Sequence, residues 1–380
     1  MTTSDLDSYR PPEDGTRRRR RPSVRDAAAG AARDLARGGR TWLNRDGGGA
    51  REAPAVPDAQ FSAYYGQSII KPVPWKHEIP TYLFVGGIAA GSGIIAAGAA
   101  ATGQQTLRRN SRYTAMAGIA LSGAALVADL GRPERFINML RTVKLTSPMS
   151  VGTWILSGYA AFAGVATAAE LARALPERPG RALDLARTAL RVVEPPATIG
   201  QALFAPPLAA YTAVLLSDTV TPVWFESRHQ LPFVFVGSAA MASGGVQMIL
   251  SPRQEARGAR RFALIGSVTD LVAMHRLEQH LEDLELGEPL ETGAAGTKLR
   301  LAKALTIAGG LGTLLTGRSR AVAVASGVAL ATASALTRFG MVEAGMVSAK
   351  DPKYTVGPQK RRLEQRRQSG TVHDSIVTVR

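Results

Sequence analysis

The chain of 380 residues contains no cysteine. It therefore forms no disulfide, and it cannot hold an ordinary iron–sulfur cluster, because cysteine thiolates ligate such clusters. Histidine is also scarce: the five histidines do not form two facing pairs on the expected spans, so we expect no intramembrane bis-histidine haem. We accordingly expect no metal and no bound cofactor in this chain. Any electron carriers would belong to a partner protein or to a diffusible ligand.

Acidic residues are too few to balance the basic ones: 30 Asp and Glu stand against 46 Lys and Arg, a net charge of +16. Such an excess can indicate nucleic-acid binding. Here, however, the arginines lie in the two tails and between apolar blocks, which is how membrane proteins distribute them. We expect no nucleic-acid partner, and we expect the run Arg17–Arg21 to contact anionic lipid headgroups.

Hydrophobic residues make up 45% of the chain and are concentrated in its middle, in blocks long enough to cross about 30 Å of hydrocarbon. Alanine and glycine dominate these blocks, which suits close packing of helices in lipid. We predict an all-α, polytopic membrane protein with about eight transmembrane helices. The expected spans are 79–103, 113–130, 151–171, 195–216, 231–250, 262–281, 299–315 and 321–347.

Proline is sparse in these spans except in the fourth, which contains Pro195-Pro196 and Pro206-Pro207. Proline lacks a backbone donor, so two such pairs predict a broken or kinked helix whose neighbours satisfy the freed carbonyls.

The polar termini of the chain and an internal sequence repeat predict the domain organisation. Residues 1–74 read as a disordered basic tail, 75–348 as the transmembrane domain and 349–380 as a basic C-terminal tail. The motif Phe84–Gly87 opens the first span, and the similar Phe235–Ser238 opens the fifth. Four spans separate the copies, so both would face the same way, giving two four-helix bundles at about 75–217 and 230–348. Chance similarity between Gly-Ala-Ser runs is the alternative.

The connection between the second and third spans is unusually polar. Asp129, Arg132, Glu134 and Arg135 lie at the membrane boundary. Ionisable residues so close to hydrocarbon are costly and mark a site or a docking surface. Asp129 and Arg132 form either a structural ion pair that closes the hairpin or, for Asp129, a proton relay. Arg135 is expected to meet an acidic partner surface or lipid headgroups.

Four motifs carry a family resemblance: YLFVGGIAAGSG at 82–93, DLGRPERFINML at 129–140, SPMSVGTWIL at 147–156 and ALTRFGMVEAG at 335–345, followed by Asp351-Pro352. Together they resemble the NrfD/PsrC family of polysulfide-reductase-type integral membrane subunits, from about Trp75 to Pro352. The resemblance implies a multi-pass anchor in the inner (cytoplasmic) membrane that exchanges electrons with quinone, either menaquinone or ubiquinone. It also implies a four-cluster ferredoxin-like iron–sulfur partner. A molybdopterin oxidoreductase, such as formate dehydrogenase or polysulfide reductase, would be the catalytic subunit.

Helix direction places the candidate site. The start of the first span, the end of the second and the start of the third lie on one membrane face, where the resemblance implies a quinone pocket. The candidate quinone-binding residues are His77, Glu78, Tyr82, Met149 and Trp154. Histidine as a residue type can exchange a proton near neutral pH, so His77 could donate to a quinone carbonyl and pass the coupled proton, or it could simply anchor the helix end. Glu78 could take the proton-passing role instead.

Asp270, His275 and Glu343, with Arg338, are candidates for a proton relay in the second bundle. Two other functions stay open. A secondary transporter would suit broken helices and a parallel repeat. A purely structural membrane scaffold would keep the partner and lack the quinone.

Overall fold

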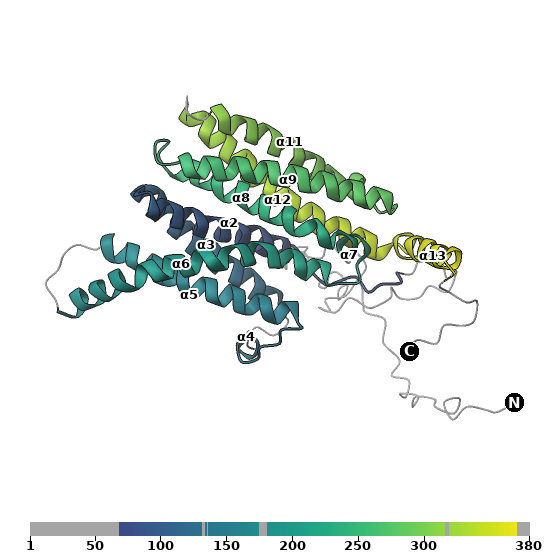
Figure 1. The fold of residues 1–380 in the computed structure, drawn as a ribbon, viewed down its shortest axis with the longest axis horizontal. Helices are drawn as coiled ribbons and strands as arrows, with labels where there is room; N and C mark the ends of the chain where they lie inside the picture. Colours follow the sequence, from purple (N-terminus) through teal and green to yellow (C-terminus); the bar gives the residue numbers. More distant parts are fainter. Residues whose placement is uncertain (1–67, 131–133, 135, 175–180, 316–318, 371–380) are drawn as a thin grey trace, which may run out of the picture. The chain divides into compact units, whose positions relative to one another are not determined.

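The computed structural model describes residues 68–130, 134, 136–174, 181–315 and 319–370, and every regular element in these ranges is a helix. The prediction of an all-α fold is therefore confirmed. The long helices, labelled in Figure 1, are α2 (Glu78–Ala101), α3 (Gln105–Asp129), α5 (Pro148–Ala174), α6 (Arg181–Ser217), α8 (Leu231–Leu250), α9 (Arg257–Asp283), α11 (Gly293–Leu315) and α12 (Arg320–Lys350). The shorter helices are α4 (Phe136–Met139), α7 (Pro222–Glu226), the 3-10 turn η3 (Ser227–His229), α10 (Glu288–Glu291) and α13 (Lys353–Gln368).

Five helical segments are long and apolar enough to cross a membrane: α2, α5, Asp184–Ser217 within α6, α8 and α12. Helices α3, α9 and α11 are as long but carry more charge, such as Arg108 and Arg112 in α3 and Asp270 and Arg276 in α9. The five segments support a polytopic membrane protein. The larger number of about eight spans stays a prediction.

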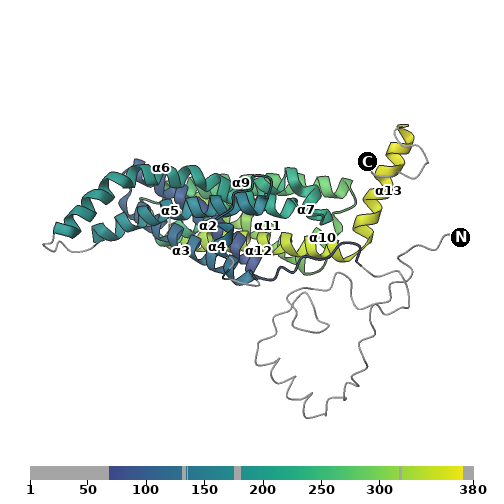
Figure 2. The same ribbon diagram turned by 90° about the horizontal axis from the view of Figure 1, so that it is seen from below.

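The long helices lie side by side (Figures 1 and 2), and each pairs with its neighbour in the chain: α2 with α3, α5 with α6, α8 with α9, and α11 with α12. Helix α2 also packs against α6, α8 and α12. Contacts therefore cross from the first half of the transmembrane domain to the second, and the division into two four-helix bundles stays a prediction.

Small residues let the helix backbones approach. A Cβ added to Gly237 in α8 would lie 2.6 Å from the backbone nitrogen of Asp270 in α9, closer than side-chain carbons can come. A Cβ at Gly91 in α2 would clash with Ser243 of α8. Gly237 of the repeated motif, and Gly91 opposite Ser243, thus serve close packing between helices, the role that small residues have in lipid.

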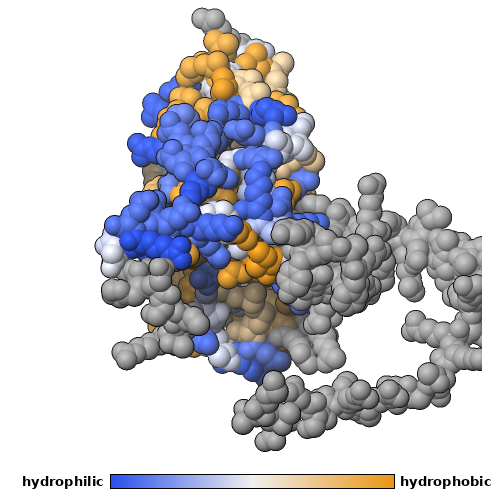
Figure 3. Space-filling model, turned by 90° about the vertical axis from the view of Figure 1, so that its right-hand side faces the viewer, coloured by the Kyte–Doolittle hydropathy of each residue, from blue (hydrophilic) through white to orange (hydrophobic). Residues whose placement is uncertain are grey.

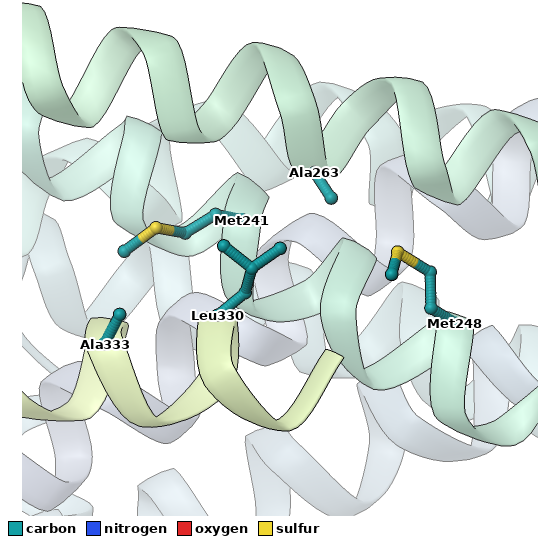
Figure 4. Close-up of a cluster of buried hydrophobic side chains, with 5 residues drawn as sticks. All are labelled: Met241, Met248, Ala263, Leu330 and Ala333. Carbon is teal, nitrogen blue, oxygen red and sulfur yellow. The ribbon is translucent and has the colours of Figure 1, made fainter. Parts of the chain in front are cut away.

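One apolar cluster shows how the second half of the domain packs (Figure 4). Met241 and Met248 of α8, Ala263 of α9, and Leu330 and Ala333 of α12 are all buried and in contact. The flexible methionines fill the space that the small alanines leave between three helices.

Helix α6 runs without interruption through all four of its prolines, so of the two expected outcomes the broken helix is wrong and the kinked helix stays a prediction. The reason lies in its packing against α5. The rings of Phe162 and Phe204 lie 5.6 Å apart, between the two proline pairs. Gly200 leaves room for Phe162, and Gly158 leaves room for Phe204, so the two helices interlock along this stretch. A packed neighbour can hold a proline-containing helix continuous in lipid.

Candidate functional site

The long helices have two opposite ends, named here the hairpin end and the arginine end. At the hairpin end, α2 begins at Glu78, α3 ends at Asp129 and α5 begins at Pro148; at the arginine end, α3 begins at Gln105 and α5 ends at Ala174. Figure 3 faces the hairpin end, where hydrophilic residues cover much of the described surface. A polar cap of this kind is what a helix bundle presents beyond the hydrocarbon.

The first turns of α2 carry two buried polar atoms that make no hydrogen bond among the described residues. Tyr82 is 1% exposed, and within the described ranges its hydroxyl makes no hydrogen bond. The Oε2 atom of Glu78, one turn earlier, is also buried and unbonded there. Residues four apart lie on one face of a helix, so both groups face the same region. Leaving them unsatisfied costs about 1–3 kcal/mol each, which makes them candidates for contacting a ligand.

His77 lies at the edge of this site. Its Nε2 is 3.5 Å from Oε1 of Glu78, and its side chain is 53% exposed. Its carbonyl accepts hydrogen bonds from the amide and the hydroxyl of Thr81, at 3.1 and 2.7 Å. The structure therefore brings His77 and Glu78 together at the start of α2.

An aromatic stack forms beside the start of α2. The rings of Trp75 and Trp224 lie 5.5 Å apart and nearly parallel. Trp224, in α7, is fully buried and donates from Nε1 to the carbonyl of Met341, 2.8 Å away, while Gly345 leaves room for its ring. Sequence reasoning missed Trp224, although a tryptophan at a span boundary is a signal for an interfacial anchor.

The hairpin residues are more exposed than the buried pair. Met149 and Trp154 are 52% and 41% exposed, and Trp154 donates from Nε1 to the carbonyl of Thr142 at 3.4 Å. Asp129 is half-buried at the end of α3, and Glu134 is exposed. Arg132 and Arg135 lie outside the described residues. Among the residues that the structure describes, no hydrogen bond joins Met149 or Trp154 to His77, Glu78 or Tyr82.

A second buried polar site lies deep among α8, α9 and α12. Arg338 is fully buried; its Nη2 donates to the carbonyl of Phe235 at 2.6 Å, and its guanidinium lies 3.7 Å above that residue's ring. Asp270 is 3% exposed, and within the described ranges its Oδ1 and the Nε and Nη1 of Arg338 have no hydrogen-bond partner. His275 is exposed, and Glu343 pairs with Lys298 of α11. Asp270 and Arg338 interact electrostatically, so the structure groups these two residues, whereas Glu343 has Lys298 as its partner and His275 is exposed.

The arginine end holds a buried ionic cluster that sequence reasoning missed. Arg112 is 1% exposed and donates to Glu170 at 3.0 Å, to Glu194 at 2.6 Å and to the hydroxyl of Thr198 at 2.7 Å. Arg108 adds a 2.6 Å bond to Glu170. The partners lie 58 to 86 residues from Arg112, so no local spacing reveals them. The one available signal is an acid inside an apolar run, as at Glu170, because such an acid needs a buried cation.

Long apolar helices packed through small residues, with charged groups buried between them, define a polytopic helical membrane protein. The chain belongs to the polysulphide reductase NrfD family, whose family model matches residues 68–284. The match covers α2 to α9, including the hairpin, and confirms the family resemblance; it contains the first three motifs, and the fourth, at 335–345, lies beyond it. No curated protein matches the chain. Membership implies a membrane subunit of polysulfide-reductase-like complexes, and this family generally associates with iron–sulfur and molybdopterin oxidoreductase subunits.

Proposed function

We propose that the chain is the quinone-reactive membrane anchor of a multi-subunit oxidoreductase. It would exchange electrons between the quinone pool and a four-cluster, ferredoxin-like iron–sulfur subunit, itself joined to a molybdopterin enzyme. The observation that supports this proposal most is a pair of buried polar atoms on α2, the Tyr82 hydroxyl and Oε2 of Glu78, which have no hydrogen-bond partner among the described residues. Because the chain has no cysteine, the clusters would belong to the partner.

The α2 groups fit a quinone, which supplies two carbonyl oxygens as acceptors and takes up protons when it is reduced. The Tyr82 hydroxyl is a donor that can hold one carbonyl. Glu78 can accept or deliver a proton within reach of the same face, and His77, 3.5 Å from Glu78, connects it to the aqueous side. The stacked Trp75 and Trp224 would provide an apolar wall. Met149 and Trp154 stay candidates for the side of the pocket that faces lipid.

The polar hairpin is the proposed docking surface for the iron–sulfur subunit. Glu134 is exposed there, and Asp129 is half-buried at its base. Arg132 and Arg135 are expected to complete the surface. Docking at this end would bring the partner's clusters towards the α2 site, which short-range electron transfer requires.

We further propose that α3, α9 and α11 also cross the inner (cytoplasmic) membrane, giving eight spans in two bundles. Their charges are an obstacle only where they face lipid. Arg112 of α3 and Asp270 of α9 are both buried among helices, which supports this assignment. Asp270 would also serve a proton relay. Its burial beside Arg338 supports that role, whereas His275 and Glu343 could join only through movement of the side chains.

Mild-detergent purification of the tagged chain, with analysis of co-purified proteins and extracted quinone, tests the proposal. An iron–sulfur protein together with quinone is the expected result. A chain that carries neither would contradict it and would favour a secondary transporter. A chain with the partner but without quinone would favour a structural scaffold.

A further inference from the structure

A cavity of about 200 Å³ lies at the arginine end, between the last turn of α5 and the first half of α6. Arginines dominate its polar lining: Arg173 comes from α5, and Arg187 and Arg191, one turn apart, come from α6. Glu194 closes the cavity on the side of the buried ionic cluster. A space of this size holds several water molecules, and hence a phosphate group.

The acid in the cavity wall adds no free negative charge. Both carboxylate oxygens of Glu194 are engaged, Oε1 by Arg112 at 2.6 Å and Oε2 by Arg173. Glu170 behind it is likewise bound by Arg108 and Arg112. No hydrogen bond or ion pair within the described ranges engages Arg191, which stays exposed beside the cavity. The cavity is therefore electropositive, and its chemistry favours an anion that several guanidinium groups can bind at once.

The surroundings of the cavity point to a lipid as the source of that anion. The residues of α6 that line the cavity belong to the apolar segment Asp184–Ser217 and lie near its beginning, at the arginine end. Next to the cavity, α6 presents Val192, Ile199 and Leu203 at the surface, with exposed fractions of 70%, 62% and 68%. These side chains run from the level of the cavity towards the middle of the helix, along the path that acyl chains follow. Figures 1 and 2 show α5 and α6 extending past α2 at this end, and the described residues that line the cavity all come from these two helices.

We propose that this cavity binds the phosphate of an anionic phospholipid headgroup, with the acyl chains lying against the exposed apolar side of α6. Arg187 and Arg191 bind the phosphate, and Arg173 links it to Glu194. Because Glu194 also holds Arg112, the bound lipid stabilises the ionic cluster that joins α3, α5 and α6. A headgroup lacking net negative charge leaves the arginines uncompensated and binds less tightly.

The test uses the full-length protein in a neutral detergent and measures its thermal unfolding midpoint with three additions: phosphatidylglycerol, phosphatidylcholine or inorganic phosphate. Phosphatidylglycerol is expected to raise the midpoint of the wild type, as any ligand specific to the folded state does. Phosphatidylcholine and inorganic phosphate are expected to leave it within error. An equal rise with inorganic phosphate would overturn the proposal, since the site would then take a free anion.

Two variants locate the effect. Arg187→Gln with Arg191→Gln removes two cations from the cavity and is expected to weaken phosphatidylglycerol binding on the order of tenfold or more, at about 1 kcal/mol for each basic residue. Arg257→Gln with Arg261→Gln removes two exposed cations from α9 at the same membrane face and is expected to keep the full shift. The proposal would be overturned if phosphatidylglycerol raised the unfolding midpoint of both double variants as much as that of the wild type. It would also be overturned if both double variants lost this rise to the same extent.

The exposed Arg191 also allows a milder test if the double variant does not fold. Arg191→Gln alone is expected to weaken phosphatidylglycerol binding about fivefold and to leave the midpoint in detergent alone unchanged. Native mass spectrometry of the same protein gives an independent measurement: phosphatidylglycerol is expected to stay bound to the wild type and to be lost from Arg191→Gln at lower collision energy. The same retention in both proteins would contradict the proposal.

Discussion

Arg112 and Glu194 are 82 residues apart in the chain, yet Nη1 of Arg112 lies 2.6 Å from Oε1 of Glu194. The same Nη1 lies 3.0 Å from Glu170, so a single buried guanidinium joins α3 to both α5 and α6. Charges are costly in hydrocarbon, and this cluster makes the cost tolerable by pairing each of them. It stands at the opposite end of the helices from the α2 site and serves the fold rather than the reaction.

Removing Arg112 should therefore destabilise the protein strongly. Arg112→Ala leaves the buried Glu170 and Glu194 with fewer cations, and such a loss typically costs about 3–5 kcal/mol. Thermal unfolding in detergent measures the change. Arg257→Ala, an exposed arginine at the same end, is the matched control and should change stability little. Equal midpoints for the two variants would contradict the structural role of the cluster.

Close contact between α8 and α9 should make Gly237 intolerant of any side chain. A Cβ there would approach the backbone of Asp270 to 2.6 Å, so Gly237→Ala must push the helices apart, at about 1–3 kcal/mol. Gly98 in α2 has open space around its Cβ position, and Gly98→Ala should be neutral or slightly stabilising through helix propensity. The unfolding midpoints of both variants check this pair, and a harmless Gly237→Ala would be inconsistent with the packing.

The docking of α13 should depend on pH. Lys353 donates a hydrogen bond to Glu288 of α10, and this bond, with one from Tyr354, lowers the pKa of Glu288 below its ordinary 4.5. A lowered carboxylate pKa stabilises the docked state above pH 4.5, and this stabilisation is lost as the pH falls through the lowered pKa. The same bond to Glu288 raises the pKa of Lys353, so its contribution is full below its ordinary 10.5 and is lost at higher pH.

Hydrogen exchange of residues 353–368 measures that docking. Protection should be highest between about pH 5 and 10 and should fall on the acid side, by a modest amount because the pair is exposed and screened by salt. Glu288→Gln should remove the fall on the acid side. An unchanged acid profile in this variant would show that another group controls the docking of α13.

Asp270 should affect proton movement, if the proposed relay operates. Asp270→Asn keeps the shape of the side chain and removes the ionisable group beside Arg338, so quinone-linked proton uptake should slow about tenfold or more. His275→Gln is the control within the same helix, because His275 is exposed and lies away from Arg338. Proton uptake by the complex in vesicles, followed with a pH dye, separates the two. Equal rates in wild type and Asp270→Asn would remove Asp270 from the relay.

Helix positions could be predicted where composition alone decides them. The span expected at 231–250 has the same bounds as α8, because polar residues and proline mark both of its ends. The structure extends α6 well before the expected start of its span and shows no break at the prolines. Packing against Phe162 and the α5 glycines holds that helix together, and such long-range contacts cannot be read from the local sequence.

The candidate site was predictable only in part. Chain direction predicted that Glu78 and Tyr82 lie at the hairpin end, but the packed structure was needed to show that Oε2 of Glu78 and the Tyr82 hydroxyl are buried with no hydrogen bond among the described residues. Trp224, in α7, stacks on Trp75 beside the start of α2. Arg112 of α3 pairs with Glu170 of α5 and Glu194 of α6. In both cases the contact joins segments far apart in the chain, and a single sequence carries no local signal of that pairing.

The most direct test of the central proposal is quinol-linked turnover of the purified complex with Tyr82→Phe. Loss of one hydrogen bond to the quinone should lower this turnover about tenfold, while activity of the partner subunits with a soluble dye stays unchanged. Tyr113→Phe makes the same chemical change at the arginine end and should leave both activities unaltered. Quinol-linked turnover that is equal in Tyr82→Phe, Tyr113→Phe and wild type would contradict the assignment of the α2 site to quinone.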